Sequence, residues 1–194
     1  MFSRLRKFSR RQDGAATLEF VVVFIGFISM MFFVMEVALY NFFVATMEKA
    51  AEAGARAVAT SPFLIPTIPQ TIEPDDGDFG DSCSQSNDTC VPFTSNPNGL
   101  SCTGEGCGAG FDRILNHMRG FNSLITANNV TVRYSEVGIG FAGGPTTPMV
   151  TVTVQGVPFQ AGILGLLLSD EGNAGTLAGL TTLPTRSASV MGEK

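Results

Sequence analysis

The sequence is poor in charge and in the residues that catalytic sites use most. Charged residues make up 15% of the chain, below the ~25% of a typical soluble protein. A single histidine, His117, leaves no second imidazole for a metal site, and no G-x-S-x-G motif marks a nucleophilic serine. We therefore expect no enzymatic activity, no cofactor and no bound metal, and a hydrolase has no residues to support it.

Positive charge is scarce after the first fourteen residues. Residues 61–194 carry five Lys or Arg against twelve Asp or Glu, a net charge of -7, which would repel nucleic acid. Residues 1–14 carry five basic residues against Asp13, a net charge of +4. Because basic residues flanking an apolar run stay in the cytoplasm, we expect a cytoplasmic N-terminus and an exported remainder.

The apolar run begins at Phe20 and is free of charge as far as Met35. Beyond Glu36 the apolar character resumes, so a transmembrane helix of the ~20 residues that a bilayer requires fits over about 20–44. A cleaved secretory signal peptide is the competing interpretation, but its apolar core would measure only ~7–15 residues. A single-pass membrane protein is therefore expected.

The helical pattern continues past the membrane segment. Residues 50–59 are rich in alanine, Glu52 and Arg56 stand at i and i+4, and Pro62 ends the pattern. We predict one helix over residues 15–60, about twice as long as the bilayer is thick. Its outer half needs a partner surface, which is either its own domain or another subunit.

Prolines, glycines and small polar residues dominate residues 61–110, which we predict to be a long loop. All four cysteines lie there, at Cys83, Cys90, Cys102 and Cys107. The C-x6-C-x11-C-x4-C spacing is unlike the close pairs of zinc sites, whereas an even number in an exported loop indicates disulfides. Three pairings are open, and of these we favour the pairing of neighbours.

Two further motifs in this loop have simple interpretations. The acidic residues Glu73, Asp75, Asp76, Asp78 and Asp81 lack EF-hand spacing and indicate a solvated surface, with a weak calcium site as the alternative. GEGCGA at 104–109 matches the letters of a dinucleotide fingerprint, but the preceding SCT does not resemble a strand. A flexible turn is expected there.

Regular structure is expected to resume in residues 111–194. Apolar spacing predicts an amphipathic helix from Phe111 to about Met118, with His117 at its surface. Alternation predicts strands at 130–134 and 150–154, separated by a long Gly- and Pro-rich turn, and a last strand at 185–191. Residues 159–168 are apolar but too short to span a bilayer. The fold class is thus α+β: a long N-terminal transmembrane helix, then a small antiparallel-sheet domain with a long disulfide-bearing loop.

The acid at Glu19, just before the apolar run, requires an explanation. An uncompensated charge within a bilayer costs roughly 2.5–3.5 kcal/mol. An interfacial carboxylate without a role is one interpretation, because snorkelling relieves part of the penalty. The other is that Glu19 meets a cation.

The residues around Glu19 carry a family resemblance. DGAATLEF, then a long apolar helix and AAEAGARAVA, resembles the start of TadE-like proteins, minor pseudopilins of the tight-adherence (Flp-type) pilus. The family pattern of glycine, small residue and Glu-Phe falls on Gly14, Ala15, Glu19 and Phe20. The MVTVTV segment followed by Pro158 and Phe159 also fits, more loosely. The cysteine-bearing loop departs from plainer members.

The resemblance implies cleavage by a prepilin peptidase between Gly14 and Ala15, which removes the basic leader and creates an ammonium at Ala15. Glu19 would then pair with the N-terminus of a neighbouring pilin-like subunit, with Phe20 beside it in the packing. An acid in the first helical turn would also interact favourably with the helix dipole. Implied partners are that peptidase, other pilin-like subunits and the tight-adherence machinery of the bacterial inner membrane. The outer domain would be periplasmic or on the pilus. The alternative is an uncleaved single-pass anchor that presents a periplasmic binding module.

Overall fold

The computed structural model describes residues 15–192, apart from 77, 84–88, 97 and 160–182. The predicted leader with Gly14, and all but the first residue of the apolar stretch at 159–168, lie outside the described residues. The chain divides into two compact units between Asn41 and Phe42. Of the described residues, the first unit holds the helix as far as Asn41, and the second holds Phe42–Phe159 and the C-terminal strand.

Helix α2 runs without interruption from Ala15 to Ala59, which confirms the long helix predicted over 15–60. It ends where prolines begin: the backbone N–H groups of Thr60 and Ser61 still donate to the carbonyls of Arg56 and Val58. Pro62 then follows, and because it has no N–H the helical ladder stops there.

A four-stranded antiparallel sheet forms the centre of the second unit. Its strands are β1 (Leu100–Thr103), β2 (Val130–Ser135), β3 (Met149–Val154) and β4 (Arg186–Met191), in the order β1-β2-β3-β4. In β2 and β3 alternate residues are buried, because successive side chains of a strand point to opposite faces. Val132 faces Val152 in the register, so the two predicted valine rows lie on the same face.

Strand β1 corrects one prediction. The segment 61–110 was predicted to be loop and SCT was judged not to be a strand, yet Leu100–Thr103 pairs with β2 along its whole length. A strand therefore does precede the GEGCGA motif, and helix α3 (Phe111–Arg119) follows it. The motif still lacks a dinucleotide-binding context, because β1 and β2 on either side of α3 are antiparallel rather than parallel.

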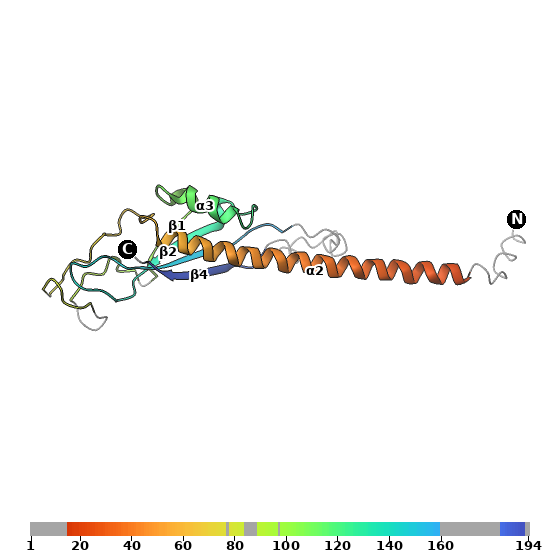
Figure 1. The fold of residues 1–194 in the computed structure, drawn as a ribbon, viewed down its shortest axis with the longest axis horizontal. Helices are drawn as coiled ribbons and strands as arrows, with labels where there is room; N and C mark the ends of the chain where they lie inside the picture. Colours follow the sequence, from red (N-terminus) through yellow and green to blue (C-terminus); the bar gives the residue numbers. More distant parts are fainter. Residues whose placement is uncertain (1–14, 77, 84–88, 97, 160–182, 193–194) are drawn as a thin grey trace, which may run out of the picture. The chain divides into compact units, whose positions relative to one another are not determined.

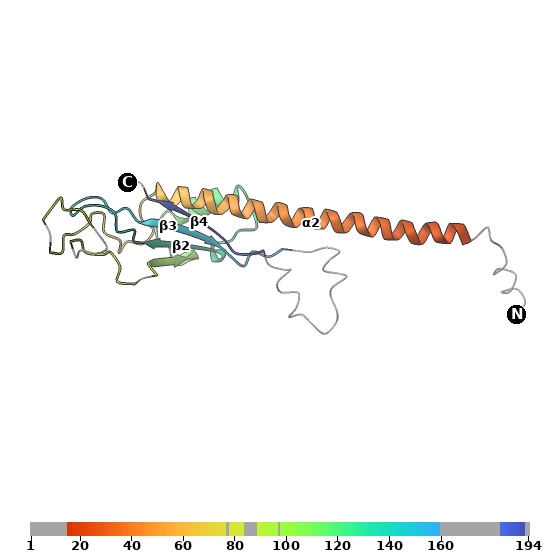
Figure 2. The same cartoon turned by 90° about the horizontal axis from the view of Figure 1, so that it is seen from below.

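The outer part of α2 packs on its own domain. Met47, Ala50, Ala51, Ala55 and Val58 are at most 2% exposed, and their i, i+3, i+4 spacing places them on one helical face. Figures 1 and 2 both show this part of the helix running alongside the sheet. Of the two partner surfaces considered for the alanine-rich stretch, the structure therefore assigns this face to the domain itself.

Small residues let α2 and α3 approach closely. A Cβ atom added at Gly54 would lie 2.7 Å from Sδ of Met118 in α3, and Met118 is fully buried. Asn122, which follows α3, donates from Nδ2 to Oγ1 of Thr46 in α2 at 3.4 Å. A glycine contact and one buried amide thus link α3, and the residues just after it, to α2.

Candidate functional site: the N-terminal helix

The first unit presents apolar side chains around the whole circumference of α2. Fourteen large apolar residues from Leu18 to Met35 are 45–70% exposed, as in Val23 at 70% and Met30 at 67%. A water-soluble helix would bury one such stripe against a core. Exposure on every face instead suits a helix surrounded by lipid or by other apolar helices.

Two polar side chains of this stretch are hydrogen-bonded within the helix. Oγ of Ser29 donates to the carbonyl of Ile25, and Nδ2 of Asn41 donates to the carbonyl of Val37, both at 2.8 Å. Such bonds to the preceding turn remove the need for water as a partner. Glu36 is only 8% exposed, unlike its neighbours. The bonds of Ser29 and Asn41 suit a segment that lies where water is absent.

Length and hydropathy agree with this interpretation. The span Thr17–Ala59 has a mean hydropathy of 2.5 in its most apolar window, of which only 6% is buried within the protein. It is the one candidate span among the described residues. A single apolar helix near the N-terminus suggests a membrane-anchored, single-pass protein.

The predicted packing residues lie at the start of this helix. Ala15 is its first residue, and Glu19 and Phe20 are both exposed. The ring of Phe20 stacks on that of Phe24 with centroids 5.8 Å apart, one turn further along. Glu19 is the fifth helical residue and lies beyond the first turn, so the predicted gain from the helix dipole, which falls off after that turn, is smaller than expected.

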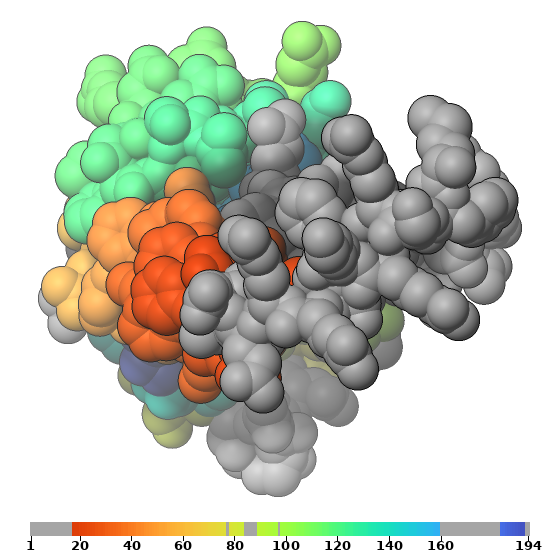
Figure 3. All heavy atoms as spheres, turned by 90° about the vertical axis from the view of Figure 1, so that its right-hand side faces the viewer, coloured from red at the N-terminus to blue at the C-terminus, as the bar shows by residue number. Residues whose placement is uncertain are grey.

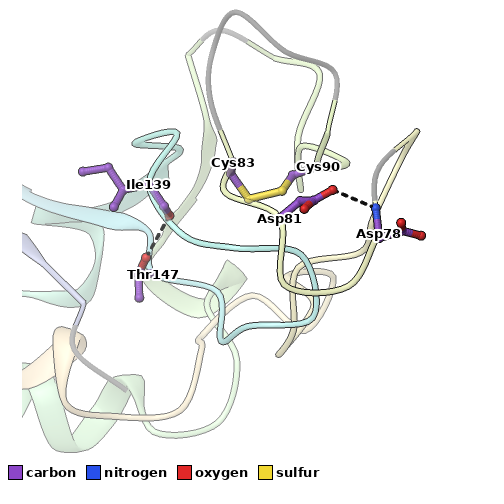
Figure 4. Close-up of a disulfide and its surroundings, with 6 residues drawn as sticks. All are labelled: Asp78, Asp81, Cys83, Cys90, Ile139 and Thr147. Atoms are coloured by element: carbon purple, nitrogen blue, oxygen red, sulfur yellow. Dashed lines mark hydrogen bonds between the residues drawn. A yellow bond between two sulfur atoms is a disulfide. The ribbon is translucent and has the colours of Figure 1, made fainter.

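The cysteines form two short-range disulfides in the second unit. Cys83 bonds to Cys90 (Figure 4), and Cys102 bonds to Cys107. This is the neighbour pairing favoured from the sequence. Cys102 lies on β1 and is 9% exposed, so its bridge ties the edge strand to the turn that follows. Cys83–Cys90 lies outside the four strands of the sheet.

The other kinds of site considered from the sequence, a metal site above all, have no counterpart among the described residues. They contain no cluster of three His, Cys, Asp or Glu side chains placed to hold a metal. A cavity beside Cys83, Cys90 and Glu136 measures about 30 Å³, which is room for one water molecule. Burial raises the pKa of the Glu136 carboxyl, and a hydrogen bond from the backbone of Phe93 opposes that rise. His117 is exposed, as predicted, with its ring edge-to-face against Phe121 at 6.0 Å.

Sequence reasoning missed a surface groove between α2 and α3. Two adjoining hollows of about 610 and 580 Å³ share Ala57, Thr60 and His117 in their linings. The spacing of Lys49, Glu52 and Arg56 would place them on one helical face, but nothing in the sequence says that α3 lies beside it. Figure 3 shows α2 (orange) and the α3 region (green) side by side.

The fold and this helix define a class: a membrane-anchored protein with one N-terminal helix and a small, disulfide-bonded α+β domain. The TadE-like protein family model matches residues 14–56 of the chain, from the predicted cleavage site to the outer part of α2. This confirms the resemblance, and it fits a protein associated with the tight-adherence pilus. No curated protein and no solved structure shows a significant match to the chain.

Proposed function

We propose that this protein is a minor pseudopilin that takes part in assembly of a tight-adherence pilus, without enzymatic activity. The observation that carries the proposal is the family match over residues 14–56, which begins at Gly14, the residue before helix α2. A prepilin peptidase would cut between Gly14 and Ala15 on the cytoplasmic side of the inner membrane. The mature chain would then start with the first residue of the helix.

Cleavage would give Glu19 its counter-ion. The new ammonium at Ala15 and a Glu19 carboxylate of a neighbouring subunit, 4 Å apart, would attract by about 4 kcal/mol at an effective dielectric near 20. Desolvation removes most of this gain. The pair would therefore set the register between adjacent helices rather than add much stability, and the exposed apolar surface of α2 would supply the packing.

The mature N-terminus tests the proposal. Intact-mass analysis of full-length protein purified from membranes of a strain with an active prepilin peptidase should find a chain that starts at Ala15. Gly14→Leu, which adds bulk at the residue before the cut, should leave the leader attached, whereas Asp13→Asn should be processed as before. A wild-type chain that retains its leader in such a strain would contradict the proposal and favour the uncleaved anchor with a periplasmic binding module.

A further inference from the structure

The groove between α2 and α3 combines positive charge with apolar surface. Arg56 and Arg113 stand at its two sides, and neither forms an ion pair with any residue the structure describes. Lys49 also lines it but is neutralised by Glu52, with Nζ and Oε2 2.9 Å apart. Between these charges lie Ala53 and Ala57 and the ring of Phe121, which is 46% exposed.

The opposite combination occurs elsewhere in the same unit. The segment 73–81 carries five exposed carboxylates, at Glu73, Asp75, Asp76, Asp78 and Asp81, and contains no basic residue. Phe79 lies among them and is 79% exposed, the highest value of any large apolar side chain among the described residues. An aromatic ring within an acidic rim matches a cationic groove with an apolar floor in both charge and surface type.

Residues 78–81 of the acidic segment are held in a defined shape. Its backbone pairs with residues 140–144: Gly80 N donates to the carbonyl of Ala142, and Ala142 N donates to that of Asp81, both at 2.9 Å. The Asp78 amide donates to Oδ2 of Asp81 at 3.0 Å, and Cys83–Cys90 closes the loop beside it (Figure 4). A segment that is already ordered loses little conformational entropy when it binds.

We propose that the acidic loop 73–81 of one copy of this chain docks in the α2–α3 groove of a second copy. Phe79 lies against Phe121, Ala53 and Ala57, while Asp76 and Asp78 meet Arg56 and Arg113. Loop and groove share no residue, so one contact leaves a free groove on one copy and a free loop on the other. These two surfaces can engage each other in a closed pair, or each can engage a further copy. This inference does not depend on removal of the leader.

Photo-crosslinking of the full-length protein in detergent micelles tests the contact directly. A benzophenone amino acid at position 79 should crosslink to segments 49–60 or 113–121 of a differently tagged second copy, as identified by mass spectrometry. Arg56→Glu with Arg113→Glu should reduce the yield at least about tenfold, as should ~1 M salt, because the charges are exposed and screened. Glu105→Lys, an exposed charge change outside both surfaces, should leave the yield unchanged.

Mixing variants separates a specific contact from general association through the apolar helix. The groove variant and an Asp76→Lys, Asp78→Lys loop variant should each fail to crosslink alone. Mixed together they should regain crosslinking, because one copy supplies an intact groove and the other an intact loop. Crosslinks that map elsewhere, that persist in the groove variant, or that reach only an acidic segment of a different protein would overturn the proposal.

Discussion

At the scale of single residues, two glycines between β1 and α3 should respond differently when each is replaced by alanine. The N–H of Gly108 donates to the carbonyl of Leu64 at 2.8 Å, and an added Cβ would lie 2.5 Å from that oxygen. Nothing lies within 4 Å of the same position at Gly106. Gly108→Ala should therefore lower the free energy of unfolding by about 1–3 kcal/mol, whereas Gly106→Ala should be neutral or stabilising by up to ~1 kcal/mol. Scanning calorimetry of the full chain in detergent compares them, and equal effects would contradict the close approach.

Tyr134 links the sheet to the segment that leaves α2. Its side chain is fully buried in β2, and its hydroxyl accepts a hydrogen bond from the Leu64 amide at 3.3 Å. Tyr134→Phe leaves that buried N–H without its partner, so we expect a loss of about 1–2 kcal/mol at neutral pH. Scanning calorimetry of the full chain in detergent measures this loss, and an unchanged free energy of unfolding would contradict the role of this hydrogen bond.

The same residue predicts an alkaline limit of stability. Burial raises the pKa of the Tyr134 phenol, and the hydrogen bond from Leu64 only partly opposes it. The native state then holds the proton more tightly than the unfolded state, so stability is intact below the ordinary pKa of about 10 and falls as the pH rises above it. In Tyr134→Phe this alkaline fall should be absent. Melting temperatures measured from neutral pH to about pH 11 test it, and parallel curves for both proteins would refute the assignment.

Glu19 predicts an effect on assembly without an effect on folding. It is exposed near the start of α2, so Glu19→Ala should leave the outer domain, membrane insertion and proposed cleavage intact while it reduces pilus formation. Glu48→Ala, an exposed acid on the outer part of the same helix, is the matched control and should assemble normally. Counting pili by electron microscopy measures both. Normal pili in the Glu19 variant would remove its role in subunit register.

At the scale of elements, α2 combines two kinds of surface in one helix. Up to Asn41 its large apolar side chains face outward, and from Met47 onward a face of small residues is buried under the domain. The sequence predicted the whole helix because apolar and alanine-rich stretches both favour helix and no proline interrupts them. The sequence did not distinguish between the two possible partners of the alanine-rich face, because small residues pack equally well on a domain or on another helix.

The two disulfides should differ in what they stabilise. Chain entropy alone assigns each short loop about 2 kcal/mol, but Cys102 lies in β1 and Cys83 lies in a surface loop. Cys102→Ser with Cys107→Ser should lower the melting temperature of the domain by several degrees. Cys83→Ser with Cys90→Ser should mainly increase amide hydrogen exchange over 73–91, since local opening there leaves the sheet paired. Equal shifts in melting would contradict this division.

The elements also show where sequence reasoning succeeds. Alternating valines identified β2 and β3, and i, i+3, i+4 spacing identified α3. In each of these elements the apolar residues of the sequence are the ones that are buried in the structure. Strand β1 was missed because LSCT has four residues, no alternation of large apolar side chains and neighbouring glycines. It is a strand because β2 supplies the hydrogen bonds. The groove was missed for the same reason, since it exists only once α3 lies beside α2.

At the scale of the whole molecule, the disulfides report on topology. If the basic N-terminus stays in the cytoplasm and the domain is exported, alkylation of whole-cell protein after acid trapping should find no free thiol. Changing Arg4, Arg6, Lys7, Arg10 and Arg11 to Glu should retain part of the chain in the reducing cytoplasm and expose thiols. Lys194→Glu serves as the control. Complete oxidation in the five-residue variant would show that these charges do not orient the protein.

The packing of α2 along the sheet also has a mechanical consequence. Within the second unit the helix lies lengthwise beside the strands (Figures 1 and 2), and its residues from Met47 to Ala59 include most of its buried face. The segment after the helix is held by the buried side chain of Leu64 and by the hydrogen bond that the Leu64 backbone N–H donates to the Tyr134 hydroxyl. Tension applied along the helix would therefore load this whole seam in shear, with its contacts resisting together. If the force were applied to a single edge strand instead, the contacts of that strand would break one after another. The observed arrangement therefore suits a domain that is pulled through its N-terminal helix.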